Sequence, residues 1–189
     1  MGIVPSRTGG GKILCRFDPF LYGRGLCFGM AAASLLYFAD CARDTRRPPL
    51  VELPLTPALL DALRRCHSWQ YGPRVVFAAV VDWVTSGGGR PEHVLRRLRL
   101  AGTSPDPHLL CFGPALNRRF LWCLARAHAV VPYRVEGRRV YVYDPNHPGD
   151  RGRFVEFWRD GRSVEFAYGG FRSREGWGIT LVPVSMCTR

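Results

Sequence analysis

The chain has 189 residues, of which 47% are hydrophobic and 12% aromatic, a composition that excludes wholesale disorder and suits one domain with a substantial core. Its net charge is +12, but every basic residue except Lys12 is an arginine, and these stand in separate short groups. The pattern indicates solvated faces rather than a nucleic-acid surface, although the charge favours acidic partners in general.

The cysteines and the N-terminal region exclude several other classes of protein. None of the seven cysteines forms a Cys-x-x-Cys pair, so the sequence shows neither a zinc signature nor a disulfide framework. The chain starts without a signal-like segment, and the apolar run 26–39 is too short to span a bilayer. We therefore expect a cytoplasmic protein with reduced thiols, no membrane span and no cofactor or metal. Its oligomeric state stays open.

The first part of the chain predicts helices. Residues 1–12 are expected to be a flexible lead-in. Thr56 before Pro57 indicates a helix N-cap with proline at the first helical position. Helices are predicted over residues 25–38, from residue 57 onward, over 73–85 and over 91–100.

After residue 105 the pattern changes to short β-branched and aromatic runs. Asp160-Gly161 between two of these runs is a hairpin signal. Helices followed by antiparallel strands predict an α+β fold in a single domain over residues 1–189. Its helical lobe would cover 13–105 and its β lobe 106–189. Strands are predicted over residues 108–112, 128–135, 139–143, 153–158, 163–167 and 178–184.

One predicted hairpin brings two polar residues together. Glu136-Gly137-Arg138 is a short turn, with glycine available for an unusual backbone angle. If Ala129–Val135 pairs antiparallel with Arg139–Val142, then His128 and Asp144 lie at the same open end of the hairpin. The imidazole would sit at the start of one strand and the carboxylate at the end of its neighbour. The carboxylate could then hold the imidazole in one tautomer.

Cys27 opens the apolar, helix-like run. A thiol at a helix N-terminus lies at the positive end of the helix dipole, which favours the thiolate. Free cysteines more often pack as small hydrophobic side chains. That interpretation fits the other six cysteines, Cys15, Cys41, Cys66, Cys111, Cys123 and Cys187.

The loop after the second hairpin strand has alternative interpretations. Asp144-Pro145-Asn146 is turn chemistry, so Asp144 has a structural explanation too. Its oxygen-bearing side chains resemble part of a calcium loop, but Val155 stands where the bidentate Glu is needed. Asn146 is an alternative to Asp144 as the group that orients His128.

Three stretches together resemble papain-like cysteine peptidases, and within them the bacteriocin-leader (double-glycine) peptidase group. These stretches are the helix from Gly25 to Phe38, the strand that begins at His128, and Tyr143-Asp144-Pro145. The resemblance covers the helix and about residues 109–149. It implies a papain-like fold, in which a helical lobe with the nucleophile helix packs on an antiparallel β lobe.

The resemblance also implies a function. Cys27 would be the nucleophile, His128 the general base and acid, and Asp144 the orienting residue of a thiol hydrolase or acyl transferase. The substrate would be a peptide or a related acyl compound.

The sequence departs from the family at one position. Papain-like enzymes place a Gln shortly before the nucleophile to complete the oxyanion hole, whereas residues 20–26 contain no Gln or Asn. The Cys27 backbone N–H would give one oxyanion donor, and Arg24 is the nearest candidate for a second. The alternative is a non-catalytic module that keeps the peptidase-like fold and binds a peptide in its groove.

Overall fold

The computed structural model describes residues 26–41, 48, 50–85, 90–101, 106–114 and 127–187. The lead-in 1–12 and Arg24 lie outside these residues. The class is α+β, as the order of the sequence patterns predicts.

In the part of the chain that the structure describes, the α-helices precede the strands, and the sequence placed each of them correctly within a few residues. Thr56 caps its helix as expected, since its Oγ1 accepts a hydrogen bond from the Leu59 N–H at 3.2 Å. In the described residues the α-helices are α3 (Cys27–Cys41), α4 (Pro57–Ser68), α5 (Pro73–Thr85) and α6 (Pro91–Ala101).

The strands form one antiparallel sheet in the order β6-β5-β4-β3-β2-β1-β7. Six strands were predicted to within two residues at each end; the two-residue β6 was missed because it is too short to give a pattern. The strands are β1 (His108–Pro114), β2 (His128–Glu136), β3 (Arg139–Tyr143), β4 (Phe154–Asp160), β5 (Ser163–Tyr168), β6 (Phe171–Arg172) and β7 (Trp177–Pro183).

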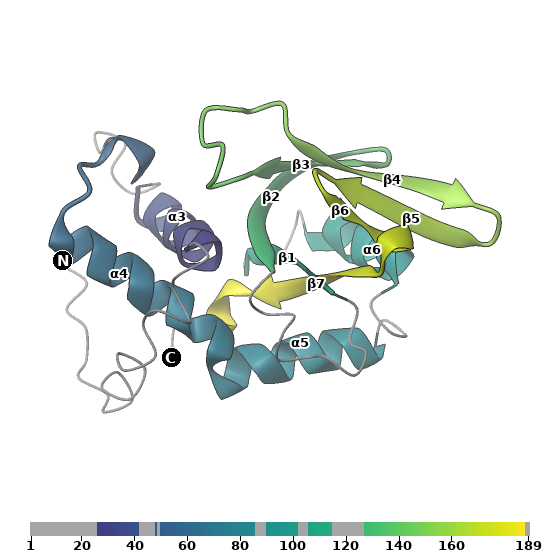
Figure 1. Ribbon diagram of the computed structural model, residues 1–189, viewed down its shortest axis with the longest axis horizontal. Helices are drawn as coiled ribbons and strands as arrows, with labels where there is room; N and C mark the ends of the chain where they lie inside the picture. Colours follow the sequence, from purple (N-terminus) through teal and green to yellow (C-terminus); the bar gives the residue numbers. More distant parts are fainter. Residues whose placement is uncertain are drawn as a thin grey trace.

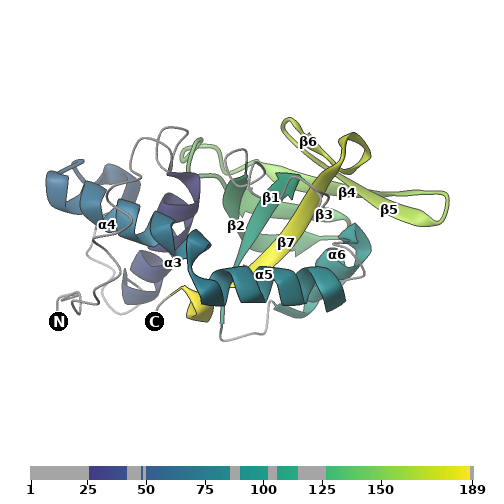
Figure 2. The same ribbon diagram turned by 60° about the horizontal axis from the view of Figure 1, so that its bottom comes forward.

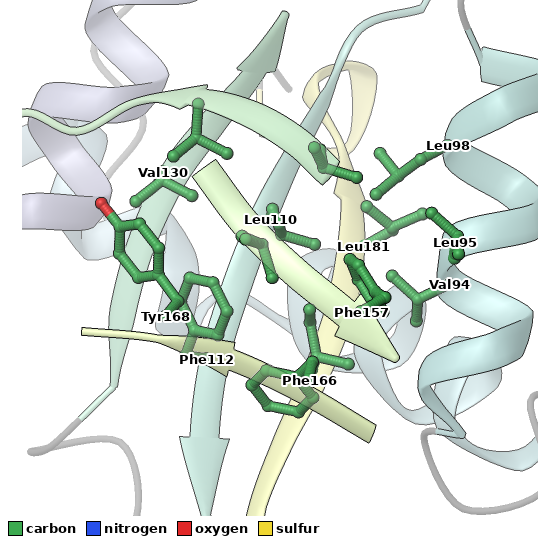
Figure 3. Packing of buried hydrophobic residues seen from close by; sticks show 14 residues of the cluster. Val94, Leu95, Leu98, Leu110, Phe112, Val130, Phe157, Phe166, Tyr168 and Leu181 are labelled. Carbon is green, nitrogen blue, oxygen red and sulfur yellow. The ribbon is translucent and has the colours of Figure 1, made fainter. Parts of the chain in front are cut away.

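The sheet curls until its two edge strands approach each other (Figure 1, Figure 2). Phe171 of β6 packs edge-on against Trp177 of β7, with 4.8 Å between the ring centroids. The curl encloses the main core, and α6 closes it from one side (Figure 3). The buried members of this core are Val94, Leu95, Leu98, Leu110, Phe112, Val130, Val140, Val142, Val155, Phe157, Phe166, Tyr168, Ile179 and Leu181.

A second apolar cluster attaches α3 to the outside of the sheet, beside β2 (Figure 1). Phe28, Ala31 and Ala32 of α3 are buried against Ala129 and Val131 of β2. The two alanines let the helix backbone approach the strand closely, because their side chains end at Cβ. This packing fixes where the first residue of α3 lies relative to the first residue of β2.

An ion pair between a buried carboxylate and a half-buried guanidinium ties α5 and α6 to β7, the strand that α5 underlies in Figure 2. The Asp82 carboxylate is 3% exposed and accepts a hydrogen bond from the Leu181 N–H at 3.2 Å. Its second oxygen pairs with the Arg97 guanidinium. Loss of Arg97 would leave the buried Asp82 carboxylate without its counter-charge. Among the described residues, no helix has both the length and the apolar character needed to cross a bilayer.

The β2–β3 hairpin pairs antiparallel, as expected, and its ladder contains one irregularity. Its register shifts between Pro132 and Arg134, so Pro132 pairs with Val142 whereas Arg134 pairs with Tyr141. The physical reason is that proline has no N–H to donate and is accommodated in a ladder at a bulge. Gly137 takes the positive φ of 58° that the turn requires.

Gly29 marks the closest approach of α3 and α4. A Cβ at this position would lie 2.3 Å from the Leu63 carbonyl oxygen and 2.8 Å from the His67 Cβ. The Leu63 oxygen is a backbone atom, so it cannot turn away as a flexible side chain would. The helices could accept a methyl group here only by moving apart.

We expect Gly29→Ala to destabilise the protein. Alanine stabilises a helix interior by at most about 1 kcal/mol relative to glycine. Overpacking costs about 1–3 kcal/mol of stability, and the atom that a Cβ would meet here belongs to the backbone and cannot turn away. The melting temperature should fall by about 2–4 °C for each kcal/mol lost from the free energy of unfolding. Gly149→Ala is the control, because a Cβ there meets nothing within 4 Å. Equal melting temperatures for the two variants would contradict the close approach.

Candidate active site

Cys27 is the first residue of α3. The Leu26 carbonyl accepts the first helical hydrogen bond, from the Met30 N–H at 2.8 Å, so the Cys27 thiol stands at the start of the helix. The N–H groups of this turn have no carbonyl within the helix to bond. The half-buried sulfur lies 3.7 Å from the carbonyl oxygen of Ala127, the residue before β2. Two segments a hundred residues apart in the chain thus meet at this thiol.

His128 and Asp144 meet at the open end of the β2–β3 hairpin, as the sequence predicts. Both are buried, with His128 7% and Asp144 2% exposed. His128 Nε2 lies 3.1 Å from Asp144 Oδ1. The same oxygen accepts the Asn146 backbone N–H at 2.9 Å.

The carboxylate determines the protonation of the imidazole. An ionised carboxylate only accepts hydrogen bonds, so His128 Nε2 must carry the hydrogen. Nδ1 is left for Cys27, with which the His128 ring shares a side-chain hydrogen bond. In the neutral ring Nδ1 has a free lone pair, which can accept a proton from the thiol.

Charge separation between Cys27 and His128 is favoured. Burial raises the pKa of the Cys27 thiol, but the hydrogen bond and charge of His128 outweigh it, helped by backbone bonds at Ala129 and Phe28. The net pKa of Cys27 is therefore lowered. For His128, burial lowers the pKa, but the hydrogen bonds to Asp144 and Cys27 raise it to about 9. Each group thus favours the charged form of the other, as a thiolate–imidazolium pair requires.

The other cysteines whose side chains are described behave differently. Burial raises the pKa of Cys66 to about 11 and that of Cys187 to about 12, and it also raises the pKa of Cys111. These three thiols stay protonated near neutral pH, in agreement with packing as small apolar side chains. Cys15 and Cys123, and the side chain of Cys41, lie outside the described residues.

Aromatic rings hold the His128 imidazole in its plane. Phe171 and Tyr168 lie nearly parallel to it, with centroids 5.8 Å and 6.2 Å away. Both also stack on Phe112, the cross-strand neighbour of His128, at 5.3 Å and 5.0 Å. The rings limit tilting of the imidazole and shield its bond to Asp144 from water.

Sequence reasoning missed two polar groups at this site. The Tyr168 hydroxyl donates to Asp144 Oδ2 at 2.5 Å, and Arg153 Nε donates to that hydroxyl at 3.1 Å. The sequence singles out neither residue as part of the site. A tyrosine hydroxyl at the end of β5 was the available signal, but its partner depends on tertiary packing.

Asp144, and not Asn146, is the residue whose side chain contacts His128. Asn146 is exposed and contributes through its backbone N–H. The second oxyanion candidate, Arg24, lies outside the described residues. Within the described ranges, no group of three or more His, Cys, Asp or Glu side chains gathers as a metal ion would require.

Comparisons with protein-family models, with curated proteins and with solved structures found no match. The geometry of the site therefore carries the functional argument.

We expect iodoacetamide to alkylate Cys27 at about pH 6 at least tenfold faster than Cys66, Cys111 or Cys187. Below the pKa of a thiol, each unit by which that pKa is lowered raises the thiolate fraction tenfold. A thiolate of lower pKa is also a weaker nucleophile, but this offsets only about half of the gain on a logarithmic scale. Peptide mapping after timed alkylation of the native protein measures each rate. Asp144→Asn should slow the alkylation of Cys27, because the His128 imidazolium loses its counter-charge.

Asp160→Asn serves as the control for that variant, because Asp160 is exposed and lies at the far end of β4. If Cys27 reacts no faster than the three buried cysteines, it is a structural thiol and the charge-separated pair does not form.

Proposed function

We propose that this protein is a thiol hydrolase or acyl transferase that acts on a peptide or a related acyl substrate. The observation that carries the proposal is the contact of Cys27, His128 and Asp144, in which a thiol of lowered pKa shares an imidazole with a buried carboxylate. A structural cysteine needs no such arrangement. Perturbed groups gathered in one place are typical of nucleophilic catalysis.

In the first half of the reaction, the Cys27 thiolate attacks the acyl carbonyl carbon and forms the C–S bond of a tetrahedral intermediate. The electron pair of the carbonyl moves to oxygen. As the intermediate collapses, the bond to the leaving group breaks. His128 Nδ1 gives its proton to the departing amine or alcohol, and a thioester on Cys27 remains.

In the second half, neutral His128 takes a proton from water or from another acyl acceptor. The resulting nucleophile attacks the thioester, and the Cys27 thiolate leaves as His128 becomes imidazolium again. Asp144 stays ionised throughout, because burial raises its pKa less than the hydrogen bonds from His128, Tyr168 and Asn146 lower it. Its role is to orient the ring and to stabilise the imidazolium.

The start of α3 supports the developing oxyanion. The Cys27 backbone N–H belongs to the first helical turn, where N–H groups are available to a ligand. We propose this N–H as one donor, and Arg24 as the second in place of the Gln that papain-like enzymes carry. The papain-like assignment is part of the proposal and rests on the resemblance of the nucleophile helix and the hairpin. A cytoplasmic location would keep the thiol reduced.

A peptide-binding module is the alternative. The absence of Gln or Asn from residues 20–26 favours it, since loss of one oxyanion donor costs about a hundredfold to a thousandfold in rate. Such a module would hold a peptide beside Cys27 without cleaving it.

We expect Cys27→Ala to abolish turnover of activated esters and peptide substrates. Asp144→Asn should lower kcat by about 10²–10⁴-fold, as loss of the orienting carboxylate does in a catalytic triad. If Arg24 donates to the oxyanion, Arg24→Ala should also lower kcat by a large factor, although turnover should not be abolished as it is in Cys27→Ala. Cys66→Ala is the matched control, because its thiol lies outside the site and stays protonated.

The same panel decides between the two functions. Absence of turnover by the wild type, with equal binding of a peptide by wild type and Cys27→Ala, would leave the binding module as the correct interpretation. Turnover that survives in Cys27→Ala would exclude Cys27 as the nucleophile.

A further inference from the structure

The Tyr168 hydroxyl lies between a cation and the carboxylate that orients His128. It donates to Asp144 Oδ2 at 2.5 Å and accepts from Arg153 Nε at 3.1 Å. Arg153 Nε itself is 3.5 Å from the same carboxylate oxygen, beyond the usual length of a charge-assisted hydrogen bond. Arg153 thus reaches Asp144 mainly through the phenol.

Arginine is a strong competitor for a carboxylate. Its planar guanidinium can bind both oxygens at once, a geometry that an imidazole cannot offer. To present both oxygens to Arg153, the Asp144 carboxylate would turn about its last side-chain bond and also give up the Asn146 N–H. Such a turn would take Oδ1 away from His128 Nε2.

We propose that Tyr168 is a positioning residue that occupies Asp144 Oδ2 and thereby keeps Arg153 from drawing this carboxylate away from His128. This inference rests on the proposed function, in which Asp144 orients His128. It adds a residue outside the Cys27, His128 and Asp144 set and assigns its hydroxyl a specific task.

The surroundings hold Tyr168 in place for this task. Its ring is 4% exposed and stacks on Phe112, while the hydroxyl points out of the apolar cluster (Figure 3). Burial and the bond to Asp144 raise the pKa of Tyr168, so the phenol remains a donor. The Arg153 backbone is held next to β3, because its carbonyl accepts the Val142 N–H at 3.0 Å.

The charged and titratable groups around the site come from several elements. Arg153 also forms an ion pair with the exposed Asp150 carboxylate, with 3.6 Å between Arg153 Nη1 and Asp150 Oδ2. Together the groups that bear on the site are Cys27 of α3, Cys111 of β1, His128 of β2, Asp144 after β3, Asp150 and Arg153 before β4, and Tyr168 of β5.

The test is the pH dependence of Cys27 alkylation by iodoacetamide in full-length variants. Tyr168→Phe removes only the hydroxyl and should move the acid limb of the profile upward by about one pH unit, a tenfold slower reaction at pH 6. Arg153→Met alone should stay within about twofold of wild type, since Tyr168 still holds Asp144. The double variant Tyr168→Phe/Arg153→Met should regain most of the lost rate, because the competitor is gone.

Tyr133→Phe is the matched control. Its hydroxyl donates to the Arg151 carbonyl at 2.6 Å, and the residue is 52% exposed. It should leave the profile unchanged. Melting temperatures of all variants separate a local effect from a loss of fold.

Recovery in the double variant supports the inference, because a merely structural tyrosine would not be rescued by removing a neighbouring cation. A Tyr168→Phe profile equal to that of wild type overturns it. So does a double variant as slow as Tyr168→Phe, or a Tyr168→Phe protein that no longer folds. Alkylation needs no turnover, so a failure of the proposed function appears only in the substrate panel, whereas a failure of this inference appears in the pH profiles.

Discussion

The hydrogen bond between His128 and Asp144 is the interaction on which the rest of the site depends. Isolated charges in a protein interior cost several kcal/mol each unless they are paired and hydrogen-bonded. Asp144 meets this condition, because its two oxygens receive His128 Nε2, the Asn146 N–H and the Tyr168 hydroxyl. The satisfied carboxylate stays ionised, and an ionised carboxylate directs the opposite nitrogen of His128 toward Cys27.

The placement of Cys27 depends on helix packing and not on polar contacts. Small residues, Ala31 and Ala32 toward the sheet and Gly29 toward α4, let α3 lie close to both neighbours. A shift of one residue along the helix would carry the thiol to another face. Apolar packing thus sets the position of the Cys27 thiol, whereas the hairpin sets that of the His128 imidazole, and the two groups meet because both elements are held in place.

Burial raises the pKa of each thiol that the structure describes, but the net shift differs between them. It raises the pKa of Cys66, Cys111 and Cys187, which have no cationic imidazole to offset it. It acts on Cys27 as well, but there the imidazolium of His128 outweighs it. The lowered pKa of Cys27 therefore depends on its contact with His128, which the other three thiols lack.

The sequence by itself determined the α+β class, the order of the elements and the meeting of His128 with Asp144. These depend on local patterns, because helix and strand periods, caps and a three-residue turn act over short stretches of chain. Only the tertiary structure decided that Cys27 reaches His128, that Pro132 is accommodated at a bulge, and that Tyr168 and Arg153 join the site. Those contacts link segments far apart in the chain. Their geometry follows from how α3 and β5 pack against the curled sheet, which no local pattern encodes.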